Sequence, residues 1–189
     1  MEYAKMRAIA EELDAWSERL EGSWSVEIGP SGPLLAMRWP SLRRHRLLRR
    51  VRDQLDQQVR ATHPGCVCVN GPEIEHPAMG RMRRPDVVVI PEALLDEEGF
   101  AVDAAQVLAV VEVLSPNPHP GFGEKLDDHP AMGIAHYMIV DPRTGTGEVH
   151  SDPVKGRYAH TEPYVFGDSV ASGPWMVKTS EFRRYGKGD

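Results

Sequence analysis

The chain has 189 residues, of which 41% are hydrophobic and 26% are charged, and its formal net charge is −6. This length and composition are ordinary for one globular domain that buries a core without disulfides or a structural metal. The acidic balance argues against a nucleic-acid coat protein, which would be basic over most of its surface. It does not exclude a local basic groove.

Several absent features indicate the cellular setting. No apolar stretch approaches the length of a membrane span, and no signal peptide is recognisable. The two cysteines, Cys66 and Cys68, have a spacing that matches no common zinc framework. On a strand they would share one face and behave as small hydrophobic residues. We therefore expect a cytoplasmic protein in a reducing environment.

The N-terminal part predicts a helix and then a hairpin. Apolar side chains recur at helical spacing over residues 3–21, so we assign residues 1–22 to an amphipathic helix. A Gly- and Pro-rich turn separates two strand-like pieces, residues 24–28 and 34–38. We expect residues 23–182 to form a single domain and residues 183–189 to form a frayed polar tail.

Residues 41–59 are the clearest predicted helix. Ser41 can cap its start, and leucines and valines recur along one stripe. Arginines crowd the opposite face. They either form a solvated face or contact the phosphates of a nucleic acid. In the second interpretation, the DNA-binding residues are Arg44, Arg46 and Arg49.

The remainder alternates strands with one short helix. Residues 121–133 are predicted as the helix, although Pro130 interrupts its last turn. The predicted strands are residues 66–70, 86–91, 106–114 and 135–140, followed by a meander over residues 148–151, 157–160 and 164–166. This order favours a single α/β domain with a mixed sheet.

Two carboxylates stand at or inside apolar strands. Glu112 interrupts the run Val107–Leu114, and Asp86 directly precedes the run Val87–Ile90. A lone ionised glutamate in a strand buried on both faces is costly to desolvate unless something pairs with it. In a structural interpretation, Asp86 ends a turn and Glu112 pairs with a nearby arginine. In a functional one, two carboxylates, a main-chain carbonyl and waters hold a divalent cation such as magnesium.

Four sequence blocks carry a resemblance to a known family. They are Arg84–Val89, Val111–Asn117, Glu124–Leu126 and Met132–Pro142. In this order and spacing they resemble the bacterial Uma-type endonuclease family of the PD-(D/E)xK, restriction-endonuclease-like superfamily, over roughly residues 24–182. The resemblance implies an α/β fold with a restriction-endonuclease-like core, in which helices flank a central mixed β-sheet. The N-terminal helix and hairpin would be additions to that core.

The resemblance also implies an activity and a site. A family member would be a hydrolase, a magnesium-dependent DNA endonuclease, with manganese as a substitute metal. Asp86 and Glu112 would hold the metal, and the carbonyl of Val113 could complete the protein ligands. Lys125 would be the catalytic lysine, reaching the site from the following helix, because Leu114 occupies the usual lysine position. Relatives often pair to cut two strands, so the resemblance is compatible with a homodimer.

This chain departs from the family pattern just before Lys125. Family members commonly carry an Asp-Arg pair there, whereas this chain has Gly121-Phe122. Losing a carboxylate near the site favours an alternative function. In that alternative the protein keeps the fold without the chemistry and acts as a nucleic-acid- or protein-binding module.

Overall fold

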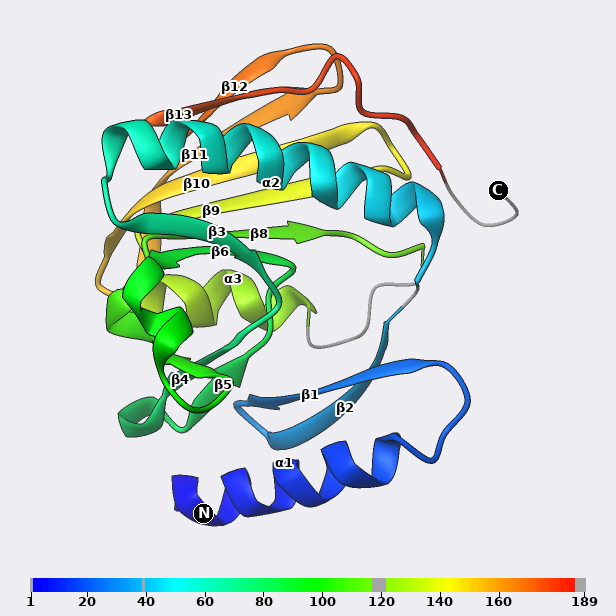
Figure 1. The fold of residues 1–189 in the computed structure, drawn as a ribbon, viewed down its shortest axis with the longest axis vertical. Helices are drawn as coiled ribbons and strands as arrows, with labels where there is room; N and C mark the ends of the chain where they lie inside the picture. Colours follow the sequence, from blue (N-terminus) through cyan, green and yellow to red (C-terminus); the bar gives the residue numbers. More distant parts are fainter. Residues whose placement is uncertain (1, 39, 117–121, 186–189) are drawn as a thin grey trace.

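Alternating apolar strands and amphipathic helices build a layered α/β fold (Figure 1). The computed structural model describes residues 2–38, 40–116 and 122–185. Its helices are α1 (Tyr3–Ser17), α2 (Leu42–Thr62) and α3 (Phe122–Ala131). Its strands are β1 (Ser23–Gly29), β2 (Gly32–Arg38), β3 (Cys66–Asn70), β4 (Glu73–His76), β5 (Arg81–Arg83), β6 (Val87–Pro91), β7 (Ala101–Asp103), β8 (Ala109–Val113), β9 (His136–Asp141), β10 (Thr146–Val154), β11 (Arg157–Val165), β12 (Ser169–Ser172) and β13 (Trp175–Lys178).

The central sheet has six strands in the order β11-β10-β9-β8-β6-β3. Strands β8 and β9 are parallel, with α3 in the connection between them, and the other neighbouring pairs are antiparallel. All five residues of β8 are buried, as the apolar run predicted. This mixed sheet with flanking helices confirms the predicted fold class.

Strand alternation divides the core between the two faces of this sheet. On one face Val87, Val89 and Val111 pack in a cluster with the buried stripe of α2, which consists of Leu47, Val51, Leu55 and Val59. On the other face Val88 and Val110 pack in a second cluster with residues that follow α3. Because side chains alternate along a strand, Glu112 lies on the opposite face from Val111.

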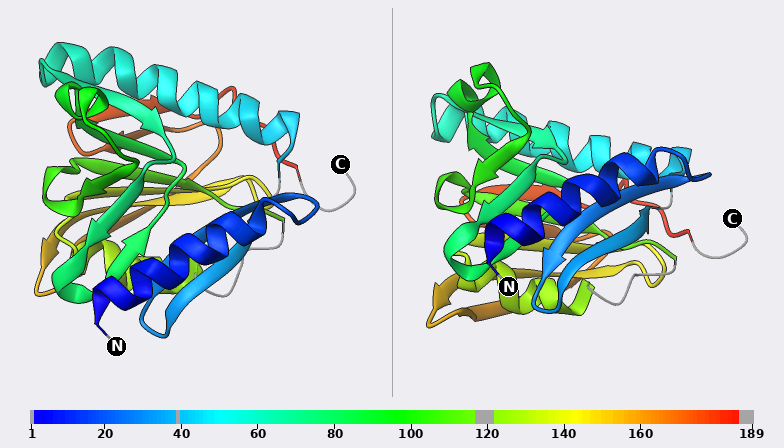
Figure 2. Two further views of the ribbon diagram at one scale, coloured as in Figure 1. Left: turned by 60° about the horizontal axis from the view of Figure 1, so that its bottom comes forward. Right: turned by 90° about the horizontal axis from the view of Figure 1, so that it is seen from below.

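A second, smaller sheet lies beside the first in the order β2-β1-β5-β4-β7. Helix α1 runs along the hairpin β1–β2 and packs Ala10 against Val26 and Ile28 (Figure 2). The only register pair between β1 and β5 in the described residues is Ile28 with Met82. The predicted N-terminal helix and hairpin are therefore both present, and the helix ends at Ser17.

Three local predictions have clear outcomes. Ser41 caps α2, because its Oγ accepts a hydrogen bond from the Arg44 N–H at 3.1 Å. Cys66 and Cys68 are free cysteines that pack with the α2-side core, as expected for small hydrophobic residues. The C-terminal end differs from the predicted frayed tail, because Tyr185 is buried and its N–H donates to the Pro142 carbonyl; residues 186–189 lie outside the described part. The short strands β12 and β13 were not predicted from the sequence.

No helix in the described part of the chain has the length and apolar character needed to cross a membrane.

His129 on α3 predicts an acid sensitivity of the fold. Its ring is fully buried edge-on to Tyr137, with 4.8 Å between centroids, and neither ring nitrogen has a hydrogen-bond partner among the described residues. Burial, reinforced by the charges of Lys125 and Arg83, holds the pKa of His129 well below its ordinary value. The unfolded chain therefore binds a proton below about pH 6.5 that the folded protein does not.

The contribution of His129 to the free energy of unfolding should thus fall as the pH drops below about 6.5, by up to about 1.4 kcal/mol per pH unit. In His129→Leu that component disappears. Urea unfolding at pH 7.5, 6 and 5 measures it, with His160→Gln, at an exposed histidine, as the control. The same pH dependence in wild type and His129→Leu would contradict the assignment.

Candidate active site

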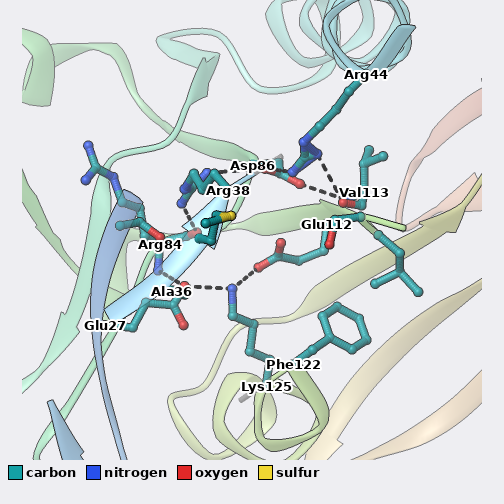
Figure 3. A pocket seen from close by; sticks show the side chains of 14 residues that line it. Glu27, Ala36, Arg38, Arg44, Arg84, Asp86, Glu112, Val113, Phe122 and Lys125 are labelled. Carbon is teal, nitrogen blue, oxygen red and sulfur yellow. Dashed lines mark hydrogen bonds and ion pairs between the residues drawn. The ribbon is translucent and has the colours of Figure 1, made fainter. Parts of the chain in front are cut away.

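A small cavity lined by several charged side chains lies where the two sheets approach each other (Figure 3). Its volume is about 50 Å³, which is room for a few water molecules. Residues from β1, β2, α2, β8, α3 and the β5–β6 connection line it. Among them are all three residues predicted to carry the chemistry, Asp86, Glu112 and Lys125.

Asp86 is fixed at the end of β8 by main-chain hydrogen bonds. Its own N–H donates to the Val111 carbonyl at 3.1 Å, and its Oδ2 accepts from the Val113 N–H at 2.8 Å. Its other oxygen, Oδ1, accepts from Arg44 Nη2 at 2.5 Å and from Arg38 Nη1 at 3.4 Å. The carboxylate is only 4% exposed, so these arginines supply the charge that its burial requires.

Glu112 and Lys125 form a buried ion pair across the cavity. Lys125 extends from α3 and places its Nζ 2.5 Å from Glu112 Oε1. Burial, with smaller contributions from Asp86 and Glu27, raises the pKa of Glu112 to about 7, although Lys125 acts in the opposite direction. Burial alone would lower the pKa of Lys125, but Glu112 and Glu27 outweigh it and raise the pKa. The lysine is therefore held as an ammonium.

Glu27 on β1 completes the site and was missed in the sequence. Its Oε1 lies 2.8 Å from Lys125 Nζ, and its Oε2 accepts from Arg83 Nη1 at 3.2 Å. Arg83, which is fully buried, also donates to Asp128 and Glu124. The available signal was a carboxylate between Val26 and Ile28, the same pattern as at Glu112 in a shorter apolar run.

The predicted site residues divide into two groups. One group comes together, and it consists of Asp86, Glu112, Lys125 and the main chain of Val113. Lys125 reaches the site from α3, as the resemblance implied, because its long side chain extends to Glu112. Arg44 also reaches this cavity, whereas Arg46 and Arg49 lie away from it. Phe122, of the altered pair before the lysine, lines the cavity. Gly121 lies outside the described residues.

The structural interpretation of the carboxylates is partly realised. Asp86 pairs with arginines, and Glu112 pairs with a lysine rather than with an arginine. Both carboxylates are therefore neutralised within the chain, and this pairing is compatible with either a structural or a chemical role.

The residues present suit a magnesium ion in the nature of their oxygens, and two of these oxygens contact the same cation. Arg44 donates both to Asp86 Oδ1 and, through Nη1, to the Val113 carbonyl at 3.1 Å. The carboxylate and the carbonyl thus face one cationic position. No set of three or more His, Cys, Asp or Glu side chains gathers as a metal site within the described residues. An ion would therefore depend on two carboxylates, a carbonyl and water, a combination that magnesium accepts.

The fold and the carboxylate–lysine arrangement define a restriction-endonuclease-like α/β protein. The profile of the Uma2 family, described as "Putative restriction endonuclease", matches residues 10–176. The chain belongs to this family, which confirms the resemblance found in the sequence.

A solved structure supports the fold independently. The crystal structure of a "putative nuclease belonging to DUF820" from Anabaena variabilis is similar, with a TM-score of 0.61 and 14% sequence identity. The similarity covers 90% of this chain and 92% of that chain. At this identity it establishes the fold alone. Comparison with curated proteins found no match.

Glu27 should be essential to stability because it touches two buried cations. Glu27→Gln leaves Lys125 and Arg83 short of one negative charge in a buried setting, which typically costs about 3–5 kcal/mol. The free energy of unfolding, measured by urea denaturation, should fall by that amount. Glu124→Gln is the matched control: Glu124 contacts the same Arg83, but its side chain is 38% exposed, so we expect a loss of about 1 kcal/mol or less. Equal losses in the two variants would contradict this account.

Proposed function

We propose that this protein is a magnesium-dependent endonuclease that hydrolyses DNA phosphodiester bonds. The observation that carries the proposal is the meeting of Asp86, Glu112 and Lys125 in one cavity. They come from a loop, a strand and a helix that are far apart in the sequence. Membership of the Uma2 family, whose description is "Putative restriction endonuclease", supports the same reaction class.

Each residue has a distinct role in the proposed reaction. Asp86, Glu112 and the Val113 carbonyl would hold magnesium, or manganese in its place. A bound ion would supply Lewis acidity at the phosphate and lower the pKa of a bound water. Lys125 orients the attacking water through its ammonium and neutralises charge on the phosphate as the new phosphorus–oxygen bond forms and the leaving-group bond breaks. Glu27 positions Lys125.

A basic groove beside Asp86 supports DNA as the substrate. Its volume is about 550 Å³, and it shares Arg38, Arg84 and Asp86 with the catalytic cavity. Arg49 and Arg52 line it from one stripe of α2, and Asp86 is the only carboxylate among the described residues that line it. On a protein with a net charge of −6, this local basic surface is the natural contact for phosphates.

The arginines predicted for DNA binding lie on two sides of α2. Arg49 faces the groove, and its side chain is 78% exposed. Arg46 lines a separate hollow with Arg43 and the C-terminal segment. This hollow shares no lining residue with the catalytic cavity. We therefore assign the DNA path to the Arg49 side.

A non-catalytic binding module is the second candidate function. The pairing of Asp86 with Arg44 and Arg38 favours it, because these arginines already supply the positive charge that a metal ion would bring. The two candidates differ in whether the purified protein cleaves DNA.

Cleavage of supercoiled plasmid tests the catalytic proposal. Wild type should nick the plasmid in magnesium or manganese. Asp86→Ala/Glu112→Ala should lose the activity, because both carboxylate ligands are gone. Lys125→Met should reduce the rate by at least about a hundredfold, since an electrostatic contact to the transition state is lost. Gel electrophoresis over time measures all three.

The control for contamination is the double variant purified in parallel. Equal nicking by it and by wild type would place the activity elsewhere. No nicking by either would favour the binding module.

The assigned DNA path predicts unequal effects from the two sides of α2. Arg49→Gln/Arg52→Gln should weaken binding to a labelled duplex about tenfold at low salt and reduce the slope of log affinity against log salt by about 2, since two phosphate contacts are lost. Fluorescence anisotropy in EDTA measures binding without cleavage. Arg43→Gln/Arg46→Gln removes the same charge from the other side and should change affinity less than threefold. Equal weakening by both pairs would refute the assigned path.

A further inference from the structure

Arg44 holds together the two oxygens that a metal ion would need. Its Nη2 lies 2.5 Å from Asp86 Oδ1, and its Nη1 lies 3.1 Å from the Val113 carbonyl oxygen. The guanidinium is planar and rigid, so its two terminal nitrogens bridge a carboxylate and a carbonyl as one unit (Figure 3). The side chain is only 13% exposed, so the contact is largely shielded from water.

The guanidinium and a metal ion cannot share this position. Magnesium requires ligand oxygens at about 2.0–2.1 Å. An ion bound to both Asp86 Oδ1 and the Val113 carbonyl would lie between these oxygens, where the Arg44 nitrogens already lie. The two cations would overlap and repel each other. Metal binding to this pair of oxygens therefore requires Arg44 to leave.

Arg38 shows why Arg44 is the specific occupant. Arg38 also contacts Asp86 Oδ1, at the longer distance of 3.4 Å, but its Nη2 donates to the Arg84 carbonyl at 2.8 Å. It makes no hydrogen bond to Val113 within the described residues, and its side chain is more exposed, at 27%. Arg38 contributes charge near the carboxylate, whereas Arg44 alone joins it to the carbonyl.

We infer that Arg44 is an internal cation that occupies the metal position and must be displaced when the metal binds. This inference rests on the proposed function, because it concerns the metal site of that activity. The observed metal affinity is then the intrinsic affinity multiplied by the fraction of molecules in which Arg44 has left Asp86. Neutralising Asp86 in the metal-free protein is the structural benefit of the same contact.

A displaced Arg44 has an evident new partner. It is anchored in the first turn of α2, where its N–H donates to Ser41 Oγ, so the guanidinium remains beside the cavity that it lines. A phosphodiester entering the cavity would present oxygens that match the guanidinium fork. Metal and substrate would therefore favour each other's binding, since the phosphate accepts the arginine that the metal displaces.

Calorimetric titration with Mn²⁺ in the absence of DNA tests the inference without requiring catalysis. Arg44→Ala should bind Mn²⁺ at least tenfold more tightly than wild type. Arg44→Lys keeps the charge but loses the fork, so its affinity should lie between the two. Arg38→Ala should gain less than Arg44→Ala, and Arg46→Ala, on the same helix but outside the cavity, should match wild type within twofold.

Thermal unfolding provides a second readout on the same proteins. Without metal, Arg44→Ala should melt below wild type, because Asp86 loses its shortest cationic contact. Saturating Mn²⁺ should raise its melting temperature by more than it raises that of wild type. Asp86→Asn introduced into Arg44→Ala should abolish the tight binding, which would locate the ion at Asp86.

The outcomes separate this inference from the proposed function. If wild type binds Mn²⁺ and Arg44→Ala binds it no more tightly, or no more tightly than Arg38→Ala, the displacement inference is wrong and the nuclease proposal stands. If neither wild type nor Arg44→Ala binds Mn²⁺, both are wrong. If Arg44→Ala does not fold, Arg44→Lys decides, and wild-type affinity in that variant overturns the inference.

Discussion

The contact of Lys125 with both Glu27 and Glu112 is the interaction on which the rest of the site depends. Two carboxylates and an ammonium are removed from water together, and each would be prohibitively costly to bury alone. Through Glu27 the contact continues to Arg83 and Asp128, so one chain of alternating charges runs from the central sheet to the smaller one. The geometry of the cavity is consequently set by charge neutrality as much as by packing.

The same neutrality defines how the protein could function. Asp86 and Glu112 have oxygens suited to a divalent ion, yet each already has a cationic partner within the chain. The two pairs are not equivalent: the Lys125 side chain, on α3, is 3% exposed, whereas that of Arg44, on α2, is 13% exposed. With Lys125 fixed and Arg44 exchangeable, the site would be stable without a metal ion. On metal binding, only the contacts of Arg44 would rearrange.

Much of the fold was predictable because short stretches of sequence indicate its helices, strands and turns. Ser41 and the α2 stripe, the apolar run around Glu112, and the Gly- and Pro-rich turn of the hairpin are each contained in a few residues. The pairing of Asp86 with Glu112 in one site was one of two interpretations of their place in apolar strands, whereas the role of Lys125 followed from the family resemblance. Glu27 and Arg83 were not predicted, because no local signal says which charged residue of one sheet will face a charge on another. Arg44 was predicted to contact phosphate, whereas its side chain turns inward and contacts Asp86. A run of arginines in the sequence does not reveal which of them turns inward.

The attachment of helix α1 and the hairpin β1–β2 to the rest of the fold has a consequence for how the molecule opens. In the described part of the chain, backbone pairing between β1 and β5 is limited to one register pair, and α1 packs mainly on the hairpin β1–β2. Helix α1 and the hairpin are held to the rest of the fold by an apolar cluster that includes Met82 of β5 and by ion pairs to Arg83 and Lys125, and these ions regain hydration when they separate. Such an attachment favours sub-global opening, with amide hydrogen exchange faster in residues 3–38 than in β8 and β9. The cavity would then come apart and re-form as a cooperative unit while the central sheet stays intact.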